Sequence, residues 1–66
     1  MKYVLDHGEF VETFSDVHDA WKALDSADTE ATLYLRKSAK EWQVYVDKHW
    51  YATNCDNLPK RILEAQ

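Results

Sequence analysis

The chain has 66 residues, with 8 Lys and Arg against 12 Asp and Glu, and a formal net charge of −4. Its 45% apolar and 30% charged residues indicate a folded domain and exclude a disordered or collagen-like chain. This length allows one domain, residues 1–66. It excludes two-domain enzymes and barrel folds of about 200 residues.

The cysteine count and the hydropathy pattern indicate the cellular compartment of the protein. One cysteine, Cys55, excludes an intramolecular disulfide. It favours a reducing compartment or, alternatively, a disulfide-linked dimer. Apolar stretches are no longer than three residues, whereas a membrane span needs about 20 and a signal peptide about 7–15. The sequence therefore predicts a cytoplasmic protein with no membrane segment.

The first predicted elements are two strands, over residues 2–5 and 9–14. Gly8 tolerates a positive φ, which places the turn between Asp6 and Gly8. The register stays open, because a two-residue turn at His7 and Gly8 and a three-residue turn with a bulge differ by one residue. Both strand faces carry apolar side chains, so the pattern does not decide between them.

A helix is predicted next, with Ser15 or Asp16 as its N-cap and its end between Ser26 and Asp28. An apolar stripe at spacings of three and four residues supports it, made by Val17, Ala20, Trp21, Leu24 and Ala27.

A second hairpin is predicted over residues 31–36 and 42–47. A loop of two or four residues pairs Leu35 with Val44 and Tyr34 with Tyr45, with aliphatic side chains on one face and the two tyrosines on the other. An odd-length loop would need a bulge to keep this segregation. The last strand can continue through Trp50 and Tyr51.

Asp56 or Asn57 is expected to cap a final helix with Pro59 in its first turn. That helix is too short to be stable alone, so Leu58 and Ile62 would dock on the core or on a second copy. The predicted fold class is α+β in the order ββαββα, a largely antiparallel four-stranded sheet with one helix on a face. The expected core is Trp21, Leu24, Leu33, Leu35, Val44 and Val46, with Trp42 and Phe14 at its edges.

Charge is distributed unevenly along the chain. Residues 1–30 have eight carboxylates against two lysines, whereas residues 31–66 have six cations against four carboxylates. The first helix is therefore acidic and the tip of the second hairpin is basic. The simplest role of such a surface is solubility, and the alternative is attraction to a basic partner. The net negative charge of the chain argues against non-specific binding of duplex DNA.

Catalytic and metal sites are weakly supported. Cys55 and His49 are six residues apart with no surrounding signature of a nucleophile and base. His7, His18, His49 and Cys55 lack the paired short spacings of structural zinc sites. The sequence therefore predicts a non-enzymatic protein without metal or cofactor.

The candidate partner-binding residues are Tyr34 and Tyr45 with their neighbours Arg36 and Gln43, and, on the acidic helix, Asp16 and Asp19. Tyr and Arg are enriched at binding hot spots, although paired tyrosines also serve as ordinary cross-strand contacts.

The expected function is a small protein-binding or regulatory module of the accessory or inhibitor type, such as phages and mobile elements encode. Its partner would be a protein, and a homodimer would add burial to so small a core. The alternative is single-stranded nucleic acid stacked on the tyrosine face, with the basic hairpin on phosphates.

Overall fold

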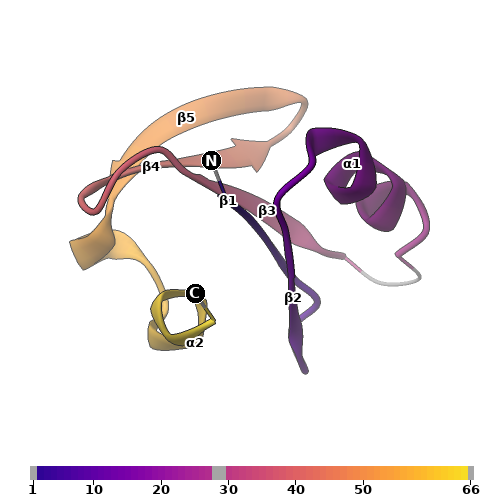
Figure 1. Ribbon diagram of the computed structural model, residues 1–66, viewed down its shortest axis with the longest axis horizontal. Helices are drawn as coiled ribbons and strands as arrows, with labels where there is room; N and C mark the ends of the chain where they lie inside the picture. The colour runs from indigo at the N-terminus through magenta and orange to yellow at the C-terminus, as the bar shows by residue number, and fades with distance from the viewer. Residues whose placement is uncertain (1, 28–29, 66) are drawn as a thin grey trace.

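The computed structural model describes residues 2–27 and 30–65 and has an α+β fold (Figure 1). One antiparallel sheet has the strand order β2-β1-β3-β4-β5. The strands are β1 (Lys2–Asp6), β2 (Val11–Phe14), β3 (Thr32–Arg36), β4 (Glu41–Val46) and β5 (His49–Asn54). The helices are α1 (Val17–Asp25), the 3-10 turn η1 (Cys55–Asn57) and α2 (Lys60–Glu64). The α+β class and the antiparallel sheet are confirmed, but the sheet has a fifth strand before α2.

The first hairpin turns one residue later than expected. The main-chain amide of His7 donates to the carbonyl of Phe10 at 2.9 Å, which leaves Gly8 and Glu9 as the turn. Gly8 has a φ of 94°, and glycine at the first central position is typical of a type II′ hairpin turn. Neither of the two registers considered from the sequence is the observed one.

Helix α1 follows the predicted pattern at its start. The side chain of Asp16 accepts a hydrogen bond from the His18 amide at 2.9 Å and so acts as the N-cap. The helix ends at Asp25 with Ser26 as its C-cap, and Asp28 lies outside the described residues. Its apolar stripe packs on β1, β2 and β3, where Ala20 is fully buried.

The register of the second hairpin differs from the expected one by a single residue. Tyr34 pairs with Val44, Leu35 with Gln43 and Arg36 with Trp42. Five residues, 37–41, lie between the last paired positions, and the amides of Lys37 and Ser38 both donate to the carbonyl of Glu41. A shift of one residue moves every side chain of β4 to the opposite face.

The fifth strand begins after a turn at Asp47 and Lys48, whose φ values are 50° and 68°. Two successive positive φ values between strands are typical of a type I′ turn. Val46 then pairs with His49, and the pairing continues to Glu41 and Asn54. The turn therefore makes β5 a full neighbour of β4 and one edge of the sheet.

The sheet buries side chains on both faces, because a helix packs on each (Figure 1). Under α1 lie Leu5 and Leu33, with Trp21, Tyr45 and Trp50 packed beside them. Under α2, which places Ile62 in the interior, lie Val4 and Trp42. The final helix therefore folds back on its own chain, and its N-cap is Pro59 instead of Asp56 or Asn57.

The observed core corrects the expected one. The buried apolar residues are Val4, Leu5, Ala20, Leu33, Leu35, Trp42 and Ile62. Trp42, expected at an edge, is only 1% exposed, whereas Val46, expected in the core, is 42% exposed. Both differences follow from the shifted register of β4.

Candidate protein-binding surfaces

Tyr34 and Tyr45 lie on opposite faces of the sheet, so the predicted face that carries both rings does not exist. Tyr34 is half-buried beside the cluster under α2. Burial, and then the charge of Asp6, raise the pKa of its phenol. Tyr45 packs under α1, with its ring centroid 4.9 Å from that of Trp21 and 5.1 Å from that of Trp50. Both rings thus contribute to packing.

Arg36 and Gln43 are separated in the same way. Arg36 lies opposite Trp42 and Gln43 opposite Leu35, and successive residues of a strand point to opposite faces. The four residues expected around one patch are therefore divided between the two faces.

The other two candidates, Asp16 and Asp19, do lie together at the start of α1 and are exposed. Asp16 is also the N-cap, so its carboxylate already has a structural role. Among the described residues, none of the ion pairs involves a carboxylate of α1. The outer side of this helix is therefore an acidic surface, with Lys22 as its one cation.

Asp6 and Arg61 form an ion pair that the sequence pattern did not indicate. Arg61 donates to Oδ2 of Asp6 from Nε at 3.0 Å and from Nη2 at 2.8 Å. The other carboxylate oxygen accepts from the Gly8 amide at 2.8 Å. Asp6 is only 6% exposed, and the hydrogen bonds from Arg61 hold the pKa of its carboxyl below the ordinary value. One sequence signal was available, because Asp6 is a carboxylate that directly follows the apolar run Tyr3-Val4-Leu5 in β1.

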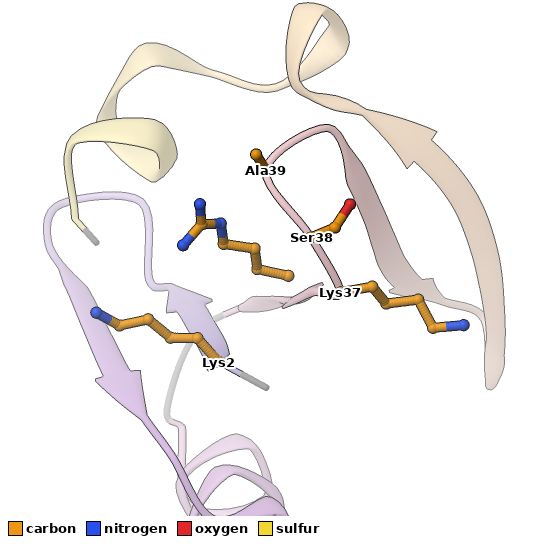
Figure 2. A pocket seen from close by; sticks show the side chains of 5 residues that line it. Lys2, Lys37, Ser38 and Ala39 are labelled. Carbon is orange, nitrogen blue, oxygen red and sulfur yellow. The ribbon is translucent and has the colours of Figure 1, made fainter.

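A basic hollow of about 340 Å³ opens beside the β3–β4 turn. Its lining residues are Lys2, Arg36, Lys37, Ser38 and Ala39. The Nε atom of Arg36 is buried without a hydrogen-bond partner. Figure 2 shows the ammonium groups of Lys2 and Lys37 pointing away from one another, to opposite sides of the hollow. The positive charge is local but does not converge on one point.

The outer side of β5 is an open sheet edge, because β5 has a single neighbouring strand within the described part of the chain. Val46 and His49 flank a two-residue turn and form a hydrogen-bonded pair in such a hairpin. Hydrogen-bonded and non-bonded pairs alternate along an antiparallel ladder. The amides and carbonyls of Trp50, Ala52 and Asn54 therefore point outward.

Exposed apolar side chains lie beside this edge. Tyr51 is 51% exposed and pairs with Val44, while Val46 is exposed on the same face. The ring of His49 lies edge-on to that of Tyr51, with centroids 6.4 Å apart. Helix α2 covers Val4 and Trp42 on this face but leaves this group, which we call the β5 patch, in solvent.

The candidate nucleophile and base are not brought together. His49 begins β5 and Cys55 directly follows its end, so the extended strand separates them by about 20 Å. Among residues 2–27 and 30–65, no group of three or more His, Cys, Asp or Glu side chains could hold a metal ion. None of the helices in this same part of the chain is long and apolar enough to cross a bilayer.

Comparisons of the chain with protein-family models, with curated proteins and with solved structures gave no match.

Proposed function

We propose that this chain is a small protein-binding module without catalytic activity, and that it binds through the open edge of β5 and the β5 patch. The observation that carries the proposal is an edge strand of six residues that contains no Lys, Arg, Asp, Glu or Pro and adjoins exposed Tyr51 and Val46. Soluble proteins usually protect such edges with charges, prolines or bulges.

An edge of this kind recognises extended polypeptide. The outward amides and carbonyls of β5 supply main-chain hydrogen bonds to an added strand, and side chains beside it supply selectivity. Here Tyr51 would contact alternate side chains of the added strand on one face, and Trp50 would do so on the other.

The acidic surface of α1 supports the same proposal in a secondary way. Exposed carboxylates at Asp16, Asp19 and Asp25 favour encounter with a basic partner surface and disfavour an acidic one. Their contribution would be to association rate and selectivity, and it would decline with added salt.

The test compares two proline variants at matched positions. Ala52→Pro removes an outward amide from β5, and Thr13→Pro removes the corresponding outward amide from β2, at the other edge of the sheet. Proline is tolerated where the amide faces solvent, so both variants should fold. Proteins that bind to the immobilised wild-type chain are purified. Each is then titrated by calorimetry against the wild type, Ala52→Pro and Thr13→Pro. The proposal requires binding that Ala52→Pro abolishes and Thr13→Pro preserves, and equal binding by both variants would contradict it.

A second candidate function is binding of single-stranded nucleic acid at the basic hollow. The observation that favours it is the buried, unpartnered Nε of Arg36 between Lys2 and Lys37. Stacking on a Tyr34–Tyr45 face is not part of this candidate, because that face does not exist. Titration of a labelled oligonucleotide at low salt tests it. Binding that Arg36→Ala abolishes supports this function, and absence of binding at tens of micromolar protein removes it.

A further inference from the structure

We propose that the strand that pairs with the edge of β5 is β5 of a second copy of this chain, so that two five-stranded sheets join into one continuous antiparallel sheet. This inference rests on the proposed function of the β5 edge and names its partner. Three features of the described residues carry it: the charges of the two edges, the self-complementary register and the positions of the helices.

The two edges of the sheet differ in charge. Strand β2 has four residues, includes Glu12 and follows Glu9, so two copies that met there would bring carboxylates together. Strand β5 has six residues and contains no Lys, Arg, Asp or Glu. For a chain with a net charge of −4, the β5 edge is therefore the one where a second copy meets least repulsion.

The sequence of β5 is compatible with pairing to itself. If Ala52 lies opposite Ala52 of the second copy, Trp50 lies opposite Asn54, and all three outward-pointing residues form hydrogen-bonded pairs. The smallest side chain then lies at the symmetry axis. On the other face Tyr51 lies opposite Thr53, an aromatic and β-branched pair of the kind that stabilises sheets. The two tyrosines become diagonal neighbours across the axis.

The helices leave room for this pairing. The twofold axis of two antiparallel edge strands is perpendicular to the sheet, so both copies of α1 lie on one face and both copies of α2 on the other. Helix α1 packs mainly on β1, β2 and β3, and its Trp21 ring reaches Trp50 of β5 with centroids 6.0 Å apart. In this dimer β4 and β5 of both copies lie between the strands on which the two α1 helices mainly pack, and the acidic surfaces of the helices point to the same side. The assembly would present two equivalent acidic surfaces to one partner.

The test uses the self-pairing of position 52. Ala52 is exposed and lies opposite uncharged Gln43, so neither Ala52→Lys nor Ala52→Glu should disturb the monomer. In the proposed dimer each substitution places two like charges directly opposite one another. A mixture of the two variants places opposite charges there instead. Thr13→Lys, at an exposed outward position of β2, is the matched control.

The measurement is sedimentation equilibrium over a range of protein concentrations, with circular dichroism to verify folding. We expect the wild type and Thr13→Lys to reach twice the chain mass of 7.8 kDa. We expect Ala52→Lys and Ala52→Glu alone to dissociate with a Kd at least tenfold higher, and their mixture to recover the dimer. A wild type that stays at 7.8 kDa, or a mixture that does not recover, would overturn the inference. If a wild-type monomer still bound another protein that Ala52→Pro failed to bind, the proposed function would stand and only the self-pairing would be wrong.

Discussion

Arg61, in the last helix, donates two hydrogen bonds to a single carboxylate oxygen of Asp6, which ends the first strand 55 residues earlier. Asp6 also accepts from the Gly8 amide, so one carboxylate connects the first hairpin turn to α2. Helix α2 has only five residues and would not be stable in isolation. This ion pair, together with buried Ile62, holds it on the sheet.

We predict that this ion pair makes stability depend on pH at the acidic end. The hydrogen bonds from Arg61 lower the pKa of Asp6 in the folded protein from its ordinary value of 3.8. A lowered folded-state pKa stabilises the protein above pH 3.8, and the contribution is lost as the pH falls through the folded-state pKa. Urea unfolding of the wild type and of Arg61→Leu from pH 7 to pH 2 tests this.

The difference in free energy of unfolding between these two proteins should be largest at neutral pH and should shrink below pH 3.8. Lys60→Leu is the control, because the Lys60–Glu64 pair is exposed and should contribute less than about 1 kcal/mol. A difference between wild type and Arg61→Leu that stays constant across this range would contradict the prediction.

The shifted register of β4 predicts which aromatic side chains interact energetically. Trp21 and Tyr45 meet edge to face at 4.9 Å, so a double-mutant cycle with leucine substitutions should give a coupling of about 0.5–1.5 kcal/mol. The same cycle for Tyr34 and Tyr45 should give less than about 0.5 kcal/mol, because the two rings lie on opposite faces. Unfolding by urea supplies all the free energies. A larger coupling energy between Tyr34 and Tyr45 would contradict the observed register of β4 and support the one expected from the sequence.

The turn between β4 and β5 predicts a stabilising substitution. Lys48 has a φ of 68°, a conformation that costs a non-glycine residue about 1 kcal/mol. Lys48→Gly should therefore raise the free energy of unfolding by about that amount, since a glycine there is favoured in type I′ turns. Lys48→Ala retains the unfavourable conformation and serves as the control, with an expected change within about 0.5 kcal/mol. Destabilisation by Lys48→Gly would show that this turn is not of the observed type.

The capping role of Asp16 can be separated from any role in binding. Asp16→Ala removes the acceptor for the His18 amide and should cost about 1 kcal/mol of stability. Asp16→Asn retains an acceptor, so the stability should stay near that of the wild type while the charge is lost. Thermal unfolding monitored by circular dichroism distinguishes the two. If Asp16→Asn destabilised the protein as much as Asp16→Ala, the contribution of Asp16 would be electrostatic instead of a hydrogen-bonded cap.

Helix α1 could be predicted from the sequence because its signals are local. The N-cap at Asp16 and the spacing from Val17 to Leu24 are properties of one segment, and a helix of this pattern has a single buried stripe. The antiparallel hairpins were predictable for a similar reason, because neighbouring strands joined by short loops pair with one another.

The register of β4 was not predictable, because both faces of the sheet are covered. The expected segregation of aliphatic from aromatic side chains in the second hairpin assumed one buried face and one solvent-exposed face. Trp42 is buried under α2 and Tyr45 packs under α1, so apolar side chains of β4 point to both faces of the sheet. With two buried faces, the hydrophobic pattern does not select one register.

Strand β5 and the ion pair of Asp6 were missed for other physical reasons. Asp47 and Lys48 adopt positive φ values without the glycine that normally marks such a turn, so the chain reversal had no signature. The partner of Asp6 is distant in sequence, and pairing at such a separation depends on the packing of α2. The open sheet edge, and with it the candidate binding site, belongs to β5, which the sequence pattern did not predict as a separate strand.

The most direct test of the central claim, that the outward edge of β5 binds polypeptide, is amide hydrogen exchange followed by NMR as protein concentration increases. In dilute protein the amides of Trp50, Ala52 and Asn54 should exchange rapidly, while those of Tyr51 and Thr53, which face β4, should be protected. At concentrations where the dimer forms, the three outward amides should become protected as well. Exchange at these three amides that stays rapid in the dimer, or in a complex with another protein, would contradict the account.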